Sequence, residues 1–103
     1  MIIAQVSTAP LGTGSTSISN FVAEAIKTIR QSGLRFTITP MGTVLEAKNM
    51  KELFETIEKC HEALFKAGAR RVYTIILIDD RRDVERTMFD KVKSVEEKLK
   101  SQS

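Results

Sequence analysis

The sequence is poor in the residues that stabilise small proteins covalently or through metal ions. It contains one cysteine, one histidine and no tryptophan in 103 residues. A single cysteine excludes an intramolecular disulfide, and Cys60 with His61 supplies too few ligands for a structural zinc site. The longest strongly apolar run is Ile75–Ile78, far short of the roughly 20 residues that span a bilayer. Stability must therefore come from one ordinary hydrophobic core.

The sequence also lacks any block of like charge. The net charge is only +3, and acidic and basic residues are interleaved wherever charges occur. This pattern is typical of a solvated mixed surface, whereas a nucleic-acid-binding protein usually shows a basic stripe. No basic residue precedes an apolar segment near the start, because the first charged side chain is Glu24. Without a signal peptide, an anchor or a disulfide, we expect a cytoplasmic location.

Apolar periodicity predicts seven secondary-structure elements. Period-2 segments indicate four strands, and apolar residues at helical spacing indicate three helices. Gly33 and Gly68 are expected to end the first two helices, and Asn49 with Glu52 has the spacing of a capping box. The expected strands are Met1–Val6, Arg35–Thr39, Thr43–Ala47 and Val72–Ile78, and the expected helices run from Ser15–Ser17 to Gly33, from Asn49 to Gly68 and over Val84–Lys100.

This β-α-β-β-α-β order with one added helix predicts an α+β fold. Two right-handed crossovers around a hairpin give the ferredoxin-like βαββαβ sandwich, with an antiparallel sheet of strand order 4-1-3-2 and an additional C-terminal helix. In this topology the uncharged segment Ser7–Ser17 and the Pro40–Gly42 turn share one end of the sheet. Glu46 and the polar segment Asp79–Asp83 should lie toward the opposite end.

The last strand predicts self-association. Val72–Ile78 is apolar on both faces, yet two helices cover only one face of a four-stranded sheet, and large bare apolar patches mark interaction sites. A second subunit would cover the other face and give a homodimer or homotetramer. The alternative is that the C-terminal helix folds back over it.

Several motifs share some features with catalytic or ion-binding sites. Gly12-Thr13-Gly14-Ser15 precedes a helix, but it lacks both the P-loop lysine and the third glycine of a dinucleotide fingerprint. A turn whose hydroxyls cap the helix explains it more simply.

Cys60 and His61 are helix neighbours that point about 100° apart, so they do not form a nucleophile–base pair, and His61 should bond a neighbouring side chain. Asp79 and Asp80 are followed by two arginines and should form surface ion pairs. We therefore expect no enzyme activity, catalytic residue, metal or cofactor.

Four motifs in fixed order resemble a known family. They are Ser7-x-x-Pro10-x-Gly12-Thr13-x-x-x-Ser17, Thr39-Pro40-Met41-Gly42-Thr43-x-x-Glu46, His61-Glu62 and Ile78-Asp79-Asp80-Arg81-Arg82-Asp83. Together they resemble the thiamine-binding protein family, small single-domain relatives of YkoF-type hydroxymethylpyrimidine-binding proteins. The segment from Thr39 to Glu46 is the most specific of the four.

The resemblance implies that residues 1–103 form one ferredoxin-like thiamine-binding domain. It implies dimers or tetramers and non-enzymatic binding of thiamine or its hydroxymethylpyrimidine moiety. Hydroxyl and backbone groups would bind the neutral pyrimidine, and a carboxylate such as Glu46 would favour the cationic thiazolium. Whether His61, Asp79 and Arg81 contact ligand or only a subunit interface stays open. The candidate ligand-binding residues are Ser7, Gly12, Thr13, Ser17, Thr37, Thr39, Met41, Gly42, Thr43 and Glu46.

Other functions remain as alternatives. The protein could be a structural or regulatory oligomer of the same fold without a thiamine ligand. A nucleic-acid-binding module would present stacking aromatic residues on strands one and three, and Met1–Val6 and Thr43–Ala47 contain none. An acylphosphatase-like hydrolase would hold phosphate with an arginine after strand one, but residues 7–23 contain no basic side chain.

Overall fold

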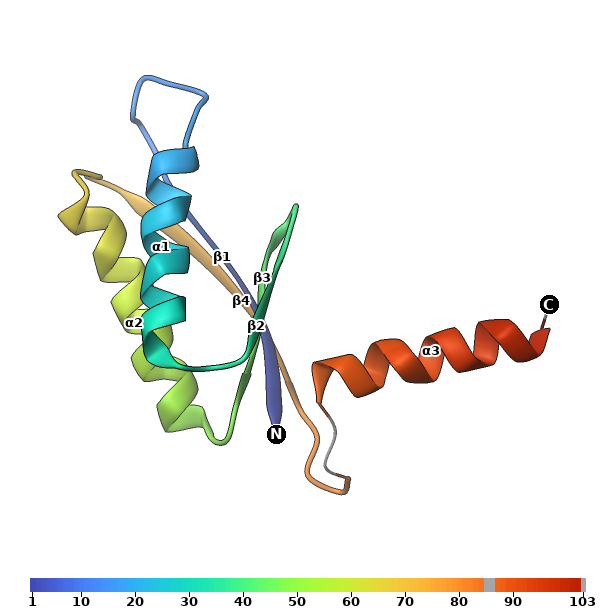
Figure 1. Cartoon of the computed structure of the whole chain (residues 1–103). Helices are drawn as coiled ribbons and strands as arrows, with labels where there is room; N and C mark the ends of the chain where they lie inside the picture. Colours follow the sequence, from blue (N-terminus) through green and yellow to red (C-terminus); the bar gives the residue numbers. More distant parts are fainter. Residues whose placement is uncertain (85–86, 103) are drawn as a thin grey trace.

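The computed structural model describes residues 1–84 and 87–102 and follows the predicted order of elements (Figure 1). Each strand and helix coincides in its main part with a segment predicted from periodicity. The elements are β1 (Ile2–Pro10), α1 (Ser19–Ser32), β2 (Phe36–Thr39), β3 (Gly42–Ala47), α2 (Met50–Lys66), β4 (Val72–Asp80) and α3 (Met88–Gln102).

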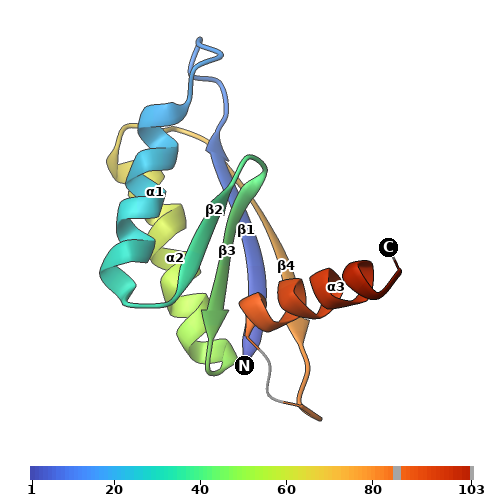
Figure 2. The same ribbon diagram turned by 45° about the vertical axis from the view of Figure 1, so that its right-hand side comes forward.

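The four strands form one antiparallel sheet in the order β2-β3-β1-β4, which confirms the predicted order 4-1-3-2. Helices α1 and α2 lie side by side on one face of this sheet, and α3 stands on the other side (Figure 2). The core lies between the sheet and the two helices. Its most deeply buried side chains are Leu45, Leu53, Leu64 and Cys60.

Local signals explain where the first two helices begin or end. Gly33 ends α1 in the left-handed conformation, φ 79°, and its N–H donates to the carbonyl of Arg30. Asn49 caps α2, because its side-chain oxygen accepts from the N–H of Glu52 at 2.8 Å. The carboxylate of Glu52 in turn accepts from the N–H of Lys48. Both the glycine stop and the capping pair were predicted from the sequence.

Two predicted boundaries near the first turn were wrong. The first strand does not end at Val6 but pairs with β4 as far as Pro10, opposite Val72. Proline is tolerated there because it sits at the end of the strand, where a missing N–H matters least. Helix α1 begins at Ser19 rather than within Ser15–Ser17, and no side chain caps it. The hydroxyls of Thr13 and Ser15 instead bond backbone groups inside the loop.

Two further boundaries changed at the other end of the sheet. Asp79 and Asp80, predicted in a loop, belong to β4 and pair with Ile3 and Ile2. The last helix begins at Met88 and not at Val84; residues 85–86 of the predicted helix lie outside the described residues. Thr87 and Asp90 form a reciprocal capping pair, with both N–H···O distances at 3.0 Å. This capping pair fixes the start of α3.

A buried carboxylate fastens α3 to the sheet. Glu46 of β3 lies on the face opposite α1 and α2, yet only 2% of it is exposed. Its Oε1 accepts a hydrogen bond from the N–H of Met88 at 2.6 Å, and Arg35 lies 3.9 Å from its Oε2. The guanidinium of Arg35 also stands 5.8 Å from the centre of the Phe89 ring. The positive end of the α3 dipole and Arg35 together balance the buried charge.

The rest of that sheet face is open. Tyr73, Ile75 and Leu77 of β4 point away from α1 and α2 and are 46–61% exposed. Beyond its first turn, α3 runs away from the sheet instead of folding back over it (Figure 1). Among the helices formed by residues 1–84 and 87–102, none combines the length and apolar character needed to cross a bilayer.

The contact between Glu46 and α3 predicts a graded response to substitution. Glu46→Ala leaves the N–H of Met88 without its buried acceptor and should lower the free energy of unfolding by about 1–3 kcal/mol. Glu46→Gln retains an acceptor oxygen but no charge, so its loss should be smaller. Urea denaturation measures both. Glu97→Ala, on the exposed part of α3, is the control and should stay within about 0.5 kcal/mol of the parent; equal losses for all three variants would contradict this role of Glu46.

Candidate functional site

A cavity of about 180 Å³ lies between α1 and the β2–β3 hairpin. The end of β1 forms one wall, the hairpin turn a second and the inner face of α1 a third. Cys60 of α2 also lines it. The lining residues are Val6, Ser7, Thr8, Ala9, Ile18, Val22, Ala25, Ile26, Ile29, Ile38, Thr39, Pro40, Met41, Gly42, Thr43 and Cys60.

Five of the ten candidate residues meet at this cavity. They come from the end of β1 and from the hairpin, two segments that the topology was expected to bring together. The five are Ser7, Thr39, Met41, Gly42 and Thr43.

The other five candidates lie elsewhere. Gly12, Thr13 and Ser17 are exposed in the loop beyond β1, which projects past the end of the sheet (Figure 1). Thr37 is exposed on β2. Glu46 lies opposite Ile3, toward the other end of the sheet, and its carboxylate is engaged with Met88. Their roles in ligand binding stay predictions.

The hairpin turn is built around Thr39 and Gly42. The hydroxyl of Thr39 donates to the carbonyl of Gly42 at 2.8 Å and accepts from the N–H of Met41 at 3.3 Å. A Cβ atom on Gly42 would lie 2.9 Å from the backbone oxygen of Val6, closer than side chains tolerate. Glycine is thus required here because β1 and β3 approach closely, which holds the turn against the cavity.

Thr43 is a polar side chain set into the inner wall. It is buried and shares a face of β3 with the core residue Leu45. Thr43 also lines the cavity, so a ligand there would lie beside its hydroxyl.

A chain of three polar side chains runs from the cavity to α2. Thr8, which lines the cavity, bonds the hydroxyl of Thr74 at 2.8 Å, and the same hydroxyl bonds Nδ1 of His61 at 2.8 Å. The ring of His61 also packs edge-on against Phe65. The prediction that His61 bonds a neighbouring side chain is confirmed. The role of Thr8 was missed because strand one was expected to end at Val6; extending the alternation by two residues places Thr8 on the Val6 face.

Cys60 is an inert wall of the cavity. It is buried, its thiol lies 3.5 Å from the carbonyl oxygen of Ala25, and burial raises the pKa of the thiol from 9.0 to about 11. The neutral thiol is a poor nucleophile. Cys60 is buried in the core, whereas His61 bonds Thr74, so the two side chains contact different neighbours.

The cavity is electrically neutral. None of its 16 lining residues carries a charged side chain. Burying a net charge without a partner is costly, so this cavity suits a small neutral molecule. Its apolar walls with a few hydroxyls and backbone groups follow the general pattern of small-molecule sites.

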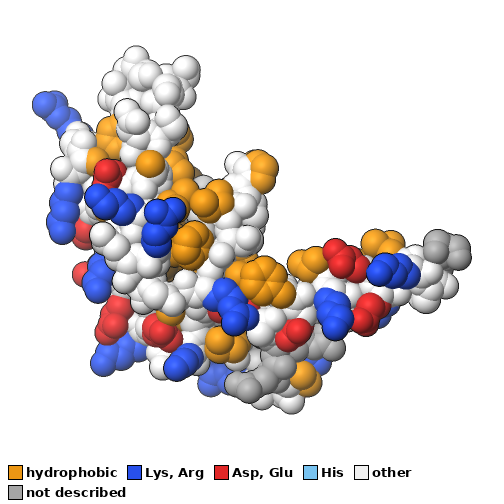
Figure 3. Space-filling view, in the orientation of Figure 1, with side chains coloured by type: hydrophobic (Ala, Val, Ile, Leu, Met, Phe, Trp, Pro, Cys, Tyr) orange, Lys and Arg blue, Asp and Glu red, His pale blue; other side chains and the backbone are white. Residues whose placement is uncertain are grey.

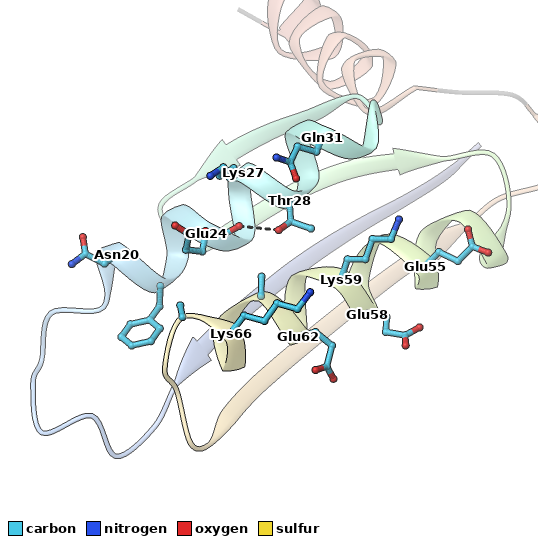
Figure 4. A pocket seen from close by; sticks show the side chains of 13 residues that line it. Asn20, Glu24, Lys27, Thr28, Gln31, Glu55, Glu58, Lys59, Glu62 and Lys66 are labelled. Atoms are coloured by element: carbon cyan, nitrogen blue, oxygen red, sulfur yellow. Dashed lines mark hydrogen bonds between the residues drawn. The ribbon is translucent and has the colours of Figure 1, made fainter.

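A larger surface groove of about 1090 Å³ separates the outer sides of α1 and α2 (Figure 4). Seven charged side chains of both signs border it, and those of Glu58 and Glu62 point away from α1. The groove is open to solvent and lacks convergent polar groups. It is therefore a weaker candidate than the cavity.

The opposite end of the sheet holds surface ion pairs. Arg82 bonds Asp80 at 2.8 Å and Arg81 bonds Asp83 at 2.7 Å. These arginines hold the pKa of the Asp80 and Asp83 carboxyls below the usual value. Asp79 pairs with Lys91 of α3. The predicted ion pairing is confirmed, and among the described residues no group of three or more His, Cys, Asp or Glu side chains could hold a metal ion.

Comparisons with known proteins agree with one another. The profile of a family described as thiamine-binding protein matches residues 4–96. A UPF0045 protein of Methanothermobacter thermautotrophicus is 48% identical over 99 residues, which cover 96% of this chain and 100% of that protein. A UPF0045 protein of Staphylococcus xylosus is 41% identical, with 96% and 95% covered.

Solved structures share the fold. A protein of Methanocaldococcus jannaschii superposes with a TM-score of 0.84 at 33% identity, covering 93% of this chain and 96% of the other. A Thermotoga maritima protein with a suggested role in thiamine biosynthesis or salvage gives 0.77 at 18% identity, with 91% and 97% covered. At that identity the second likeness supports the α+β architecture alone.

The buried thiol predicts a specific alkaline instability. Above pH 9 the unfolded chain ionises Cys60 while the folded chain keeps it neutral up to about pH 11. The unfolded state then binds fewer protons, so this group lowers the free energy of unfolding as pH rises from 9 to 11, by up to about 2–3 kcal/mol. Urea denaturation at pH 8 and pH 10.5 should show a smaller decline for Cys60→Ala than for the parent. Identical declines would mean that the thiol ionises equally in both states.

Proposed function

The chain belongs to the thiamine-binding protein family, and on this premise we propose that its cavity binds the hydroxymethylpyrimidine moiety of thiamine without chemical turnover. The observation that carries the proposal is the wholly uncharged lining of the cavity between α1 and the hairpin. An aminopyrimidine is flat and neutral, with donors and acceptors along its edge. The hydroxyl of Thr43 and the backbone of the hairpin supply matching groups beside apolar walls.

The size of the cavity favours the pyrimidine over the whole vitamin. Its volume of about 180 Å³ is below the roughly 300–1,000 Å³ of typical ligand pockets. One small ring suits this space better than two. If thiamine binds, its cationic thiazolium extends toward solvent past Met41, which lines the cavity and is 78% exposed.

The remaining candidate residues receive different roles in this proposal. Glu46 holds α3 rather than the thiazolium, because its carboxylate already accepts from Met88 and lies near Arg35. Thr39 shapes the turn through its bond to Gly42. Gly12, Thr13 and Ser17 would reach a ligand only if their loop folds toward the hairpin.

We also propose that the binding form is a homo-oligomer, a dimer or tetramer of chains 1–103, in the cytoplasm. The exposed apolar side chains of β4 support self-association, since patches of this kind mark interaction surfaces. A structural or regulatory oligomer without a thiamine ligand is the alternative function. This alternative has the same fold and the same self-association, and differs only in that no ligand binds in the cavity.

Substitution of Thr43 tests the cavity directly. Thr43→Val keeps the shape of the side chain and removes its hydroxyl, so affinity for hydroxymethylpyrimidine should fall about tenfold, equivalent to about 1.4 kcal/mol. Gly42→Ala should weaken binding more, because its Cβ approaches the oxygen of Val6 at 2.9 Å and shifts the turn. Calorimetric titration with hydroxymethylpyrimidine and with thiamine measures both.

Thr16→Val is the matched control, the same substitution at an exposed position of the loop after β1 and outside the cavity lining, and should bind like the parent. Equal affinity for Thr43→Val and the parent would remove the pyrimidine from this cavity. An absence of heat with either compound would favour the alternative of a structural oligomer.

Native mass spectrometry of freshly purified protein tests retention and assembly together. We expect complexes of two or four chains that carry a small molecule, released on collisional activation as intact hydroxymethylpyrimidine or thiamine. Incubation with thiamine should return the vitamin unaltered. Turnover abolished by a single substitution would contradict the proposed non-enzymatic role.

A further inference from the structure

Polar side chains interrupt the apolar layer between the sheet and α2. On α2, His61 lies one turn before Leu64, which is fully buried in the core. On β4, Thr74 stands between Val72 and Ile76, whose side chains pack against the same core. An apolar residue would pack well at either position, and polar groups in such a layer are costly unless they are bonded. The polar pair therefore has a reason other than packing.

These side chains belong to a hydrogen-bonded chain that ends at the cavity. Nδ1 of His61 lies 2.8 Å from the hydroxyl of Thr74, which lies 2.8 Å from the hydroxyl of Thr8. We call these three residues the relay. Thr8 shares the inward face of β1 with Val6, and both line the cavity, whereas His61 does not. The edge contact of His61 with Phe65, with ring centres 5.5 Å apart, holds the plane of the imidazole.

The relay ends at one of the few hydroxyls on the inner wall of the cavity. Figure 3 shows hydrophobic side chains gathered between α1 and the hairpin, where the cavity lies. Among the lining residues with a hydroxyl group, Thr39 bonds the turn, and Ser7 alternates to the other face of β1. Thr8 and Thr43 therefore supply the hydroxyls of the inner wall.

The hydrogen bonds of the relay can run in two directions. A hydroxyl has one proton to donate and lone pairs that accept, and a neutral imidazole carries its proton on either nitrogen. Among the described residues, the hydroxyl of Thr74 bonds only His61 and Thr8, so it donates to one and accepts from the other. With the proton on Nδ1, His61 donates to Thr74, Thr74 donates to Thr8, and the proton of Thr8 is left for a ligand. With the proton on Nε2, both bonds reverse, and Thr8 offers a ligand only lone pairs.

We propose that His61 is a positioning residue which, through Thr74, sets whether Thr8 donates to or accepts from a molecule in the cavity. This inference rests on the proposed binding of a pyrimidine and deepens it. An aminopyrimidine presents both kinds of group, an amino group that donates and ring nitrogens that accept. Because both bonds of the relay reverse without movement of a heavy atom, one threonine can match whichever group faces it. The tautomer of His61 changes in step.

Substitution at the middle of the relay tests this role. Thr74→Val keeps the shape of the side chain and removes the hydroxyl that joins His61 to Thr8. The hydroxyl of Thr8 then loses the polarisation that a chain of hydrogen bonds supplies, so calorimetric affinity for hydroxymethylpyrimidine should fall about fivefold. Thr74→Ser, the matched control, retains a hydroxyl and should bind like the parent. In a Thr8→Val background, Thr74→Val should add little further loss, because residues that act through one another are not additive.

The ring nitrogens of His61 give a signature that a merely structural contact would not change. The chain contains one histidine, so nitrogen NMR spectra of isotope-labelled, tag-free protein show one pair of ring signals, whose positions report which nitrogen carries the proton. At pH 8, where histidine rings are generally neutral, we expect both directions of the relay in the free protein and one direction in the complex. Hydroxymethylpyrimidine should therefore shift both signals in the parent and in Thr74→Ser, and neither in Thr74→Val.

Equal affinity for Thr74→Val and the parent would overturn the inference and leave the pyrimidine proposal standing, and so would ring signals that stay in place when the parent binds. If circular dichroism shows that Thr74→Val does not fold, His61→Phe replaces it, since it keeps a planar ring against Phe65 and removes both nitrogens. Its affinity should fall by the same factor. No binding by the parent would overturn the pyrimidine proposal, and the role of His61 with it.

Discussion

A four-stranded sheet with two helices has one face covered and one face bare, and this constraint governs the rest of the molecule. On the covered face, hydrophobic burial builds the core and leaves a small neutral cavity where α1 meets the hairpin. On the bare face, apolar side chains of β4 meet solvent. The two proposed activities, binding a small molecule and binding a second copy, thus belong to opposite faces of one sheet.

On the bare face, the carboxylate of Glu46 binds the start of α3. A buried carboxylate is unfavourable unless it is bonded and balanced, and here the first N–H of α3 and the guanidinium of Arg35 do both. The same arrangement positions α3 at a steep angle to the sheet. An apolar residue in place of Glu46 would leave the N–H of Met88 without its acceptor and α3 without this point of attachment.

The sequence predicts the fold more completely than the site. Alternation in the strands, the helix end at Gly33 and the helix cap at Asn49 depend on neighbouring residues in the sequence, so they can be recognised from the sequence alone.

The end of a strand depends instead on the strand that pairs with it. Strand β1 continues to Pro10 because β4 pairs with it as far as Val72. That extension carries the glycine-containing loop about 13 Å past the hairpin pairing at Val6 and Thr43. It separates Gly12 and Thr13 from Thr43, whereas Ser7 stays beside the turn. The bond between Thr8 and Thr74 joins residues 66 positions apart, which no local pattern reveals.

The short edge strand β2 has a consequence for how the cavity opens. It comprises four residues and pairs only with β3, so its outer backbone groups face solvent. Segments with few contacts unfold locally more often than the rest of a protein. The edge of the hairpin that lines the cavity is such a segment. Amide hydrogens of β2 and of the turn that follows it should thus exchange faster than those of β1 and of β3 near Leu45. A molecule seated against Thr43 ties the edge strand to α1, so occupancy of the cavity becomes visible as slowed exchange at the margin of the sheet.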